Sequence, residues 1–186
     1  MKRREILAAA LALSVSAGAA AIPANAQSLD PENTIYLDTK YGRTVIKLRP
    51  DLAPNHVKRI KKLTREGFYN GIKFHRVIEG FMAQSGDPTG TGTGGSKYSD
   101  IRAEFSLAPF ERGTLGMARS SSPNSANSQF FICFSRASSL NGKYTVFGEV
   151  VSGMEFIDKI RRGQGSSGMV NNPDKIKKMQ MAADAK

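Results

Sequence analysis

The stretch that decides the fold lies at residues 74–87 and reads FHRVIEGFMAQSGD. Phe74–Ile78 and Phe81–Gln84 each have the composition of a short β-strand, and Gly80 separates them as a turn residue would. Arg76 places a cation inside the first, otherwise apolar strand, where a charged residue needs a partner or a purpose. The pattern alone leaves two interpretations open: a salt bridge to the surface, or a role in a functional site.

His75 stands beside Arg76, and successive side chains of a strand point to opposite faces of the sheet. We therefore expect His75 to pack in the core rather than to act as a base. The only other histidine is His56, which we expect to be a surface or capping residue. With two histidines, no paired carboxylates and no Cys/His spacing that fits a metal, the sequence offers little to a hydrolytic triad or a metal centre. Because the glycine-rich segment 90–95 opens no apolar helix, we do not expect dinucleotide binding.

Outward from this stretch, the chain shows eight strand patterns and two helical patterns, spread over 186 residues that suggest one domain. One helix opens at Ala53-Pro54-Asn55 and stops at Gly67, and the second covers Met154–Arg161. Because the strand pairs are close in sequence, an antiparallel sheet is favoured over a parallel one. We predict a mainly β fold, a closed eight-stranded antiparallel barrel capped by two α-helices. Its strands are expected at Thr34–Asp38, Val45–Leu48, Phe74–Ile78, Phe81–Gln84, Thr114–Ala118, Gln129–Ser135, Tyr144–Val151 and Lys175–Met181.

The N-terminus has the pattern of an export signal. A basic start at residues 2–4 precedes the apolar run Ile6–Ile22, and Ala24-Asn25-Ala26 fits signal peptidase cleavage. We predict a cleaved signal peptide at 1–26, a short leader at 27–33 and one domain at 34–186. A retained membrane anchor is the alternative, and Sec and twin-arginine export both stay open. The expected location is the periplasm, with a secreted form possible.

Charge and cysteine usage narrow the possible classes further. The formal net charge is +11, and the first 26 residues account for +2 of it, which leaves +9 for the rest. Such a charge fits nucleic acid or anionic membranes, but the basic residues are spread along the chain and no aromatics interleave with them. We therefore favour a solvated surface. The single cysteine, Cys133, allows no internal disulfide, and its apolar neighbours favour buried, inert packing.

Four segments together resemble the cyclophilin-type peptidyl-prolyl cis/trans isomerases, in order and with matching spacing from about residue 34 to 181. Residues 74–87 are similar to the central motif of that family. The second and third matches lie at Leu115–Ala118 with Asn124–Ile132, and at Leu140–Gly148. Phe68–Gly71 fits as well. Among cyclophilins, residues 120–128 and the C-terminus look most like bacterial exported members.

The resemblance implies an active groove on one face of the barrel. Arg76 would be the catalytic arginine, and Gln84 would hydrogen-bond the substrate backbone beside it. Substrate-binding positions carried over from the family are Phe81, Met82, Ala118, Arg119, Gln129, Phe131, Leu140 and Tyr144. As plain structural alternatives, Met82 and Phe131 could be core residues, and Gln129 could be purely structural.

The implied chemistry needs neither a nucleophile nor a cofactor, so we expect no cofactor and no metal. Rotation about a peptide bond has a barrier of ~18–20 kcal/mol, yet the two isomers of an X–Pro bond are close in energy. A guanidinium can donate a hydrogen bond to the prolyl nitrogen once the twisted amide regains its lone pair. That interaction is stronger in the transition state than in the ground state, so it is catalytic.

Three positions depart from many eukaryotic cyclophilins. Ser139 stands where those members have Trp, which makes cyclosporin sensitivity doubtful. Tyr144 replaces a His, and Arg119 replaces an Asn. Arg119 adds a second cation near the groove and should favour acidic residues in substrates.

The expected partners are proline-containing unfolded or extended polypeptides. We expect no nucleic acid, no membrane contact after signal cleavage, and a monomer. Two competing hypotheses remain: a binding module that holds peptides as a chaperone with incidental turnover, and a basic surface-binding protein.

Overall fold

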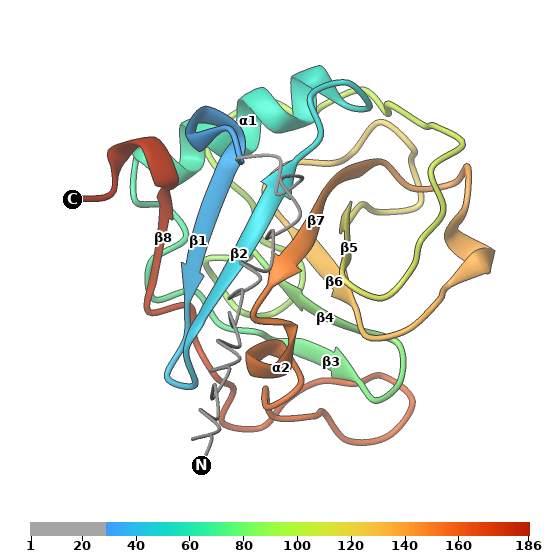
Figure 1. Ribbon diagram of the computed structural model, residues 1–186. Helices are drawn as coiled ribbons and strands as arrows, with labels where there is room; N and C mark the ends of the chain where they lie inside the picture. The colour runs from blue at the N-terminus through green and yellow to red at the C-terminus, as the bar shows by residue number, and fades with distance from the viewer. Residues whose placement is uncertain (1–28) are drawn as a thin grey trace, which may run out of the picture.

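The computed structural model describes residues 29–186, in which eight strands form one antiparallel sheet. Their order across the sheet is β3-β4-β6-β5-β7-β2-β1-β8, and the sheet curls around the core (Figure 1). All eight predicted strands are present, most of them shorter than expected by a residue or more. The strands are β1 (Thr34–Asp38), β2 (Arg43–Leu48), β3 (Arg76–Ile78), β4 (Met82–Ser85), β5 (Thr114–Met117), β6 (Phe130–Cys133), β7 (Val146–Ser152) and β8 (Lys178–Met181).

The two outer strands of the sheet, β3 and β8, share no ladder in the described part of the chain. The gap between them is bridged by two irregular segments, 71–74 and 174–176, which we call the seam. The Phe74 amide donates to the Asp174 carbonyl at 2.8 Å, and the Gly71 amide donates to the Ile176 carbonyl at 2.7 Å. The antiparallel, mainly β fold is confirmed, whereas the closed barrel stays a prediction.

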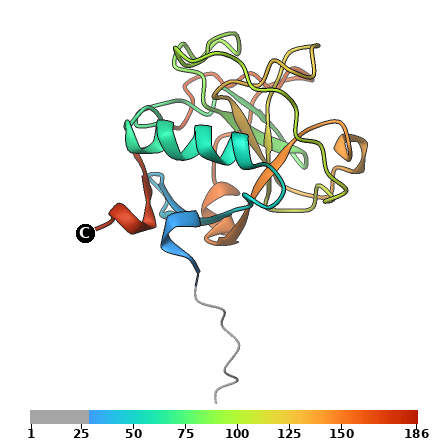
Figure 2. The ribbon, with the colours of Figure 1, turned by 90° about the horizontal axis from the view of Figure 1, so that it is seen from above.

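Two α-helices lie at opposite ends of the curled sheet (Figures 1 and 2). Helix α1 covers Pro54–Arg65, with proline in its first turn and an apolar stripe of Val57, Ile60 and Leu63 buried against the sheet. Helix α2 covers only Met154–Ile157, so the predicted Met154–Arg161 was too long. Short 3-10 turns lie at Pro31–Asn33, Ser138–Leu140 and Ala182–Asp184.

The early end of α2 has a tertiary cause. The Arg161 amide donates to the carboxylate of Asp174 at 2.8 Å instead of continuing the helical ladder. The Gly163 amide then donates to the Val77 carbonyl at 2.9 Å, which draws the chain onto β3. Such distant partners are not visible in the local periodicity on which the longer helix was predicted.

His56 is fully buried and lies within the first turn of helix α1, whose N-cap is Ala53, so the expectation of a surface or capping residue was wrong. Its Nδ1 lies 2.6 Å from the Glu104 carboxylate, which also accepts the backbone amides of Asn55 and His56 at 3.1 and 3.0 Å. Helix α1 has no side-chain cap from its own Ala53. Glu104 therefore caps the helix from a distant loop and draws His56 inward with it.

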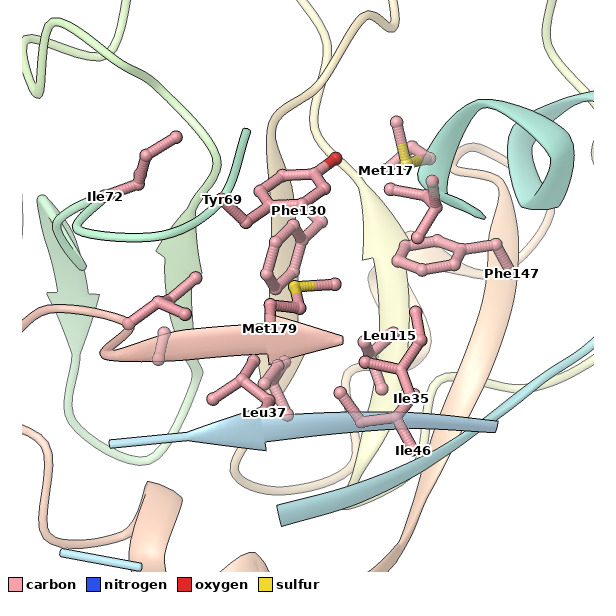
Figure 3. Packing of buried hydrophobic residues seen from close by; sticks show 14 of the residues in the cluster. Ile35, Leu37, Ile46, Tyr69, Ile72, Leu115, Met117, Phe130, Phe147 and Met179 are labelled. Atoms are coloured by element: carbon pink, nitrogen blue, oxygen red, sulfur yellow. The ribbon is translucent and has the colours of Figure 1, made fainter. Parts of the chain in front are cut away.

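Strand alternation divides the apolar residues between two faces of the sheet. On β6, Phe130 and Ile132 point into the main core, while Phe131 and Cys133 point to the opposite face. The main core collects side chains from many strands, as Figure 3 shows for Leu37, Met117 and Phe147 among others. The smaller cluster on the outer face contains Met82, Phe110, Phe131, Cys133, Ala137 and Val146, and it forms the floor of the site described next.

The predicted signal peptide lies outside the described residues, and its cleavage and the leader stay predictions. Within the described part of the leader, Glu32 pairs with Arg65 of helix α1 at 2.8 Å. Arg65 also pairs with Asp184 near the C-terminus, at 3.0 Å. No helix in residues 29–186 is long and apolar enough to cross a membrane.

Candidate active site

The site is built on one row of residues that runs across four adjacent strands. Arg76 on β3 stands opposite Gln84 on β4, Gln84 stands opposite Phe131 on β6, and Phe131 stands opposite Gly116 on β5. Directly opposed residues of an antiparallel sheet share a face. The row therefore places a cation, an amide, an aromatic ring and a glycine side by side on the outer face.

Arg76 is half-buried and is held by two uncharged acceptors. Its Nε donates to the Ser167 carbonyl at 2.9 Å, and its Nη1 donates to Oε1 of Gln84 at 3.3 Å. It forms no ion pair with any residue of the described chain, so the surface salt bridge considered from the sequence is absent there. The charge of the guanidinium is therefore not compensated by a carboxylate, and Arg76 lines the pocket described below.

A chain of side-chain amides fixes Gln84. Its Nε2 donates to Oε1 of Gln129 at 2.9 Å, and Nε2 of Gln129 donates to the carbonyls of Gly92 and Gly94 at 3.0 and 2.8 Å. Gln129 is thus structural through these bonds and also lines the groove. The orientation of Arg76 is therefore set by a relay that ends in the glycine-rich loop.

The glycine-rich loop is ordered around the carboxylate of Asp87. That carboxylate accepts the backbone amides of Thr89, Thr91 and Gly92 at 2.7, 3.1 and 2.6 Å, and the Thr89 hydroxyl at 2.7 Å. Burial alone would raise the pKa of Asp87, but these hydrogen bonds outweigh burial and lower it to about 2. The irregular loop expected from its glycines is therefore held by one anion.

Nine of the ten predicted site residues line a single pocket of about 200 Å³. They are Arg76, Phe81, Met82, Gln84, Ala118, Arg119, Phe131, Leu140 and Tyr144. The tenth, Gln129, lines an adjoining pocket of about 560 Å³, which shares Gln84, Ala118 and Arg119 with the first. The two concavities form one groove, with an apolar slot at one end and an amide-rich stretch beyond it. Roles for these residues remain predictions.

Aromatic packing makes the floor of the slot rigid. The Phe131 ring stacks on Phe110 with centroids 5.7 Å apart and meets Tyr144 edge-to-face at 5.8 Å. A Cβ built on Gly116 would lie 2.3 Å from the Phe131 ring, so only glycine fits beneath it. Phe131 and Met82 are 5% and 1% exposed, and both belong to the floor cluster as well as to the pocket lining. The core and site interpretations of these two residues therefore do not exclude each other.

A family model decides to which family the chain belongs. The model described as cyclophilin type peptidyl-prolyl cis-trans isomerase/CLD matches residues 34–181, nearly the whole described chain. The chain belongs to the cyclophilin family. It is therefore a peptidyl-prolyl cis-trans isomerase, as the resemblance of its motifs implied.

Individual relatives agree with this assignment. A "Probable peptidyl-prolyl cis-trans isomerase" of Brucella suis biovar 1 (strain 1330) is 55% identical, over 98% of both chains. A crystal structure of a cyclophilin from Hirschia baltica is similar with a TM-score of 0.76 at 27% identity, over 85% of this chain and 77% of that one. A cyclophilin of Cryptosporidium parvum, crystallised in the presence of the dipeptide Ala-Pro, gives a TM-score of 0.74 at 32% identity, covering 80% and 98%.

The rim of this cyclophilin groove carries a stacked cation. The guanidinium of Arg119 lies 4.5 Å from the centroid of the Tyr144 ring. Its nitrogens donate to the carbonyls of Lys143, Ser120 and Ser121 at 2.9–3.3 Å. Two of the departures from eukaryotic cyclophilins, Arg119 and Tyr144, thus form one unit, while Ser139 is exposed on the short turn before Leu140.

Two further groups were expected to be inert. His75 is 1% exposed, and burial lowers its pKa against the opposing effect of Asp87. Cys133 is fully buried, and burial raises the pKa of its thiol to about 12. The expectation of core packing is confirmed for both. Within residues 29–186, no three His, Cys, Asp or Glu side chains stand close enough together to hold a metal.

Sequence reasoning missed three contributors to the cyclophilin site. Ser167 anchors Arg76 through its carbonyl, and Phe110 supports Phe131 from a segment without a strand pattern. Asp87 organises the loop that holds Gln129. Only Asp87 gave a local signal, because Asp followed two residues later by Thr is a common turn-forming pattern.

Proposed function

We propose that the apolar slot holds the proline ring of an extended polypeptide and that Arg76 stabilises the twisted X–Pro bond. The observation that carries the proposal is the position of Arg76: half-buried, on the rim of the slot, and held only by uncharged acceptors. A cation in this state has charge to offer to a developing lone pair. The Ala-Pro dipeptide in the crystals of the Cryptosporidium relative supports proline as the group recognised.

The chemistry follows from the electronic change during rotation. Twisting the amide breaks its resonance and returns a lone pair to the prolyl nitrogen, so that nitrogen accepts a hydrogen bond that it cannot accept when planar. Lowering the barrier by about 6 kcal/mol accelerates rotation by roughly 10⁴-fold. One charge-assisted hydrogen bond contributes about 1.5–3 kcal/mol. Water exclusion and the grip of Phe81, Met82, Phe131 and Leu140 on the ring supply the remainder.

Gln84 has two proposed tasks. Its side-chain oxygen accepts from Arg76, and its amide nitrogen is held by Gln129, so the side chain sets the direction of the guanidinium. It also lines both pockets and can hydrogen-bond the substrate backbone between them. Ala118 and Arg119, at the same junction, offer backbone groups to an extended chain.

The cellular role that fits this site is assistance to the folding of exported proteins. The motif at residues 24–26 predicts signal cleavage, and we propose a monomer that works in the periplasm on unfolded, proline-containing chains. The uncatalysed X–Pro exchange takes tens to hundreds of seconds, long enough to limit folding. A chaperone role would use the same groove for binding without turnover.

The test measures isomerisation and binding separately with the chain from Gln27 onward. NMR exchange on an Ala-Pro peptide gives kcat/KM, and we expect Arg76→Ala to lower it roughly 30-fold or more, the equivalent of about 2 kcal/mol. Peptide affinity should stay within about tenfold, because the slot that grips the ring is intact. Arg43→Ala is the matched control, since Arg43 lies on β2 and pairs with Asp38 away from the groove.

The outcomes of this test distinguish catalysis by Arg76 from simple peptide binding. Loss of turnover with retained binding supports catalysis by Arg76. An Arg76→Ala variant that isomerises as fast as the wild type removes Arg76 from the mechanism. Wild-type protein that binds the peptide without accelerating exchange favours the binding module instead.

A further inference from the structure

A second concavity lies between helix α1 and the loop at 97–102. Its volume is about 380 Å³, and we call it the basic cleft. It is lined by Asn55, Lys58, Arg59, Lys62, Tyr98, Asp100, Ile101 and Arg102. Four cations in one lining of eight residues set it apart from the proline slot, which has two cations, Arg76 and Arg119, among nine lining residues.

Two cations of the basic cleft, and a third beside it, lie near one aromatic ring. Lys62 Nζ lies 4.0 Å from the centroid of the Tyr98 ring, and Arg59 and Lys97 lie at 5.2 and 5.4 Å. The contacts of Tyr98 with Arg59 and Lys62 are not visible in the linear sequence, because Tyr98 meets helix α1 only in the folded chain. Basic residues that are spread along the sequence therefore lie close together around this ring.

The nearby carboxylates offset this charge only in part. Asp100 accepts from the side-chain amide of Asn127 at 3.0 Å, and Glu66 accepts from the Tyr98 hydroxyl. Glu104 is occupied by the first amides of helix α1 and by His56. None of these three carboxylates forms an ion pair with a lysine or arginine in the described chain. The basic cleft therefore presents five cations, Lys97 included, against three engaged carboxylates.

The basic cleft adjoins the substrate groove. It shares Asp100 with the amide-rich pocket, which in turn shares Gln84, Ala118 and Arg119 with the proline slot. Arg59 reaches across the common wall and donates to the Asn127 carbonyl at 3.4 Å. An extended polypeptide seated in the slot can therefore follow one track to the cleft.

We propose that the basic cleft is a second contact site for the same polypeptide substrate and that it selects acidic side chains remote from the proline. The proposal rests on the proposed function of the slot. Because an extended chain advances about 3.3 Å per residue and has to cross the intermediate pocket, the acidic segment lies several residues from the proline. Carboxylates there complement the lysines and raise the rate of encounter as well as affinity.

Nucleic acid fits the basic cleft less well than an acidic polypeptide. Single-stranded nucleic acids bind through aromatic rings on which bases stack. The Tyr98 ring is already covered by three cations, and its hydroxyl is bonded to Glu66. The cleft also joins a groove built for a polypeptide.

The experiment compares two double variants that remove equal charge. Lys58→Gln/Lys62→Gln changes two exposed residues of the basic cleft, which lie outside the slot and form no ion pair within residues 29–186. Lys177→Gln/Lys178→Gln is the matched control, because both lysines are exposed, unpaired in the described chain and away from all three pockets of the track. The substrates are Ala-Pro peptides that carry about four glutamates roughly six residues before or after the proline, and the same peptides with glutamines.

At about 10 mM salt, where charges interact over about 30 Å, wild type should turn over at least one glutamate peptide with a kcat/KM roughly three- to tenfold above its glutamine counterpart. The cleft variant should lose that preference, and the control should keep it. Turnover of the glutamine peptides should be equal in all three proteins, which keeps this test separate from the test of Arg76. A proline-free glutamate peptide in fluorescence polarisation measures binding at the cleft without any turnover.

Equal kcat/KM for glutamate and glutamine peptides in wild type overturns the proposal, as does a preference that the cleft variant retains. Tighter binding of a DNA oligonucleotide than of the proline-free glutamate peptide would assign the cleft to nucleic acid instead. Failure of every peptide to turn over, with intact glutamate binding, would reject the proposed role of the slot and leave the cleft standing.

Discussion

Arg76 is anchored by the Ser167 carbonyl and the Gln84 side chain, and neither carries a charge. A carboxylate at either place would hold the guanidinium more tightly, but it would also compete with the prolyl nitrogen for it. The amide at Gln84 therefore orients the cation without neutralising it. The same amide needs its nitrogen to donate to Gln129, a bond that no carboxylate could make.

Replacement of this amide by its isosteric acid tests the argument. Gln84→Glu puts a negative charge about where Oε1 now accepts from Arg76 and breaks the bond to Gln129. We expect kcat/KM at pH 7 to fall roughly tenfold or more, an effect of about 1.4 kcal/mol or more on the barrier. Gln180→Glu, on β8 away from the groove, should leave it unchanged in the same NMR exchange measurement. Wild-type turnover by Gln84→Glu would show that the neutrality of the anchor is irrelevant.

His75 offers a pH-dependent prediction. Burial lowers the pKa of His75, with Asp87 opposing and Arg76 reinforcing the shift, so the unfolded chain binds the proton more readily than the folded one. The stability due to a neutral His75 is therefore present above about pH 6.5 and is lost as the pH falls below it. His75→Gln should flatten the decline in unfolding free energy between pH 7 and 5, measured by urea denaturation.

The slope should not vanish in that variant, because burial also lowers the pKa of His56. Each histidine contributes at most about 1.4 kcal/mol per pH unit. An identical decline in wild type and His75→Gln would contradict the assignment of proton-linked instability to His75.

Strand β5 carries a glycine at the position where it supports the floor of the slot. Gly116 stands opposite Phe131, and an added Cβ would lie 2.3 Å from that ring and 2.6 Å from Phe110. Because the two rings are stacked on each other, neither can yield without moving the floor of the slot. We expect Gly116→Ala to cost about 1–3 kcal/mol of stability and to lower kcat/KM by more than it lowers the folded fraction.

A second substitution, which makes a neighbouring side chain smaller, tests this explanation. Phe110→Leu, combined with Gly116→Ala, leaves room for the Phe131 ring to shift away from the new methyl group. The double variant should recover part of the lost kcat/KM in the NMR exchange assay, with thermal melts to report the folded fraction. Wild-type activity in Gly116→Ala alone would mean that the floor is more compliant than its packing indicates.

Local sequence pattern was sufficient to locate the eight strands, but it could not predict contacts between distant elements. Alternation identified β1 to its exact bounds, and motif resemblance gathered the residues that line the slot. Helix α2 was predicted too long because Asp174 captures the Arg161 amide, and His56 was misplaced because its partner Glu104 is 48 residues away. The cluster at Tyr98 was not predicted for the same reason: Arg59 and Lys62 lie on helix α1, and no periodicity indicates that Tyr98 contacts them.

At the scale of the whole molecule, the sheet depends on the seam between its outer strands. Asp174 is 7% exposed and is the centre of that seam. Its carboxylate accepts from Lys40 at 2.7 Å, from the Tyr41 hydroxyl at 3.3 Å and from the Arg161 amide at 2.8 Å. Its carbonyl accepts from Phe74. One residue thus joins the β1–β2 hairpin, the segment after α2 and the segment that leads into β3, the strand that carries Arg76.

These bonds also determine how the contribution of Asp174 to stability changes with pH. Burial alone would raise the pKa of Asp174, but the hydrogen bonds from Lys40 and the Arg161 amide prevail and lower it. Its contribution to stability is therefore present above about pH 4, the unfolded value, and is lost as the pH falls further.

Asp174→Ala should consequently destabilise the whole molecule while leaving the slot residues in place. Loss of the carboxylate leaves the part-buried Arg161 amide without its partner, which costs about 1–3 kcal/mol, whereas exposed Lys40 is rehydrated at little cost. We expect that loss in urea denaturation at pH 7, with faster hydrogen exchange at the Gly71 and Phe74 amides of the seam. Asp51→Ala, which breaks only the exposed pair with Arg49, should change stability by less than about 0.5 kcal/mol. Equal losses in the two variants, or unchanged exchange at the seam, would mean that the outer strands are held together by the core alone.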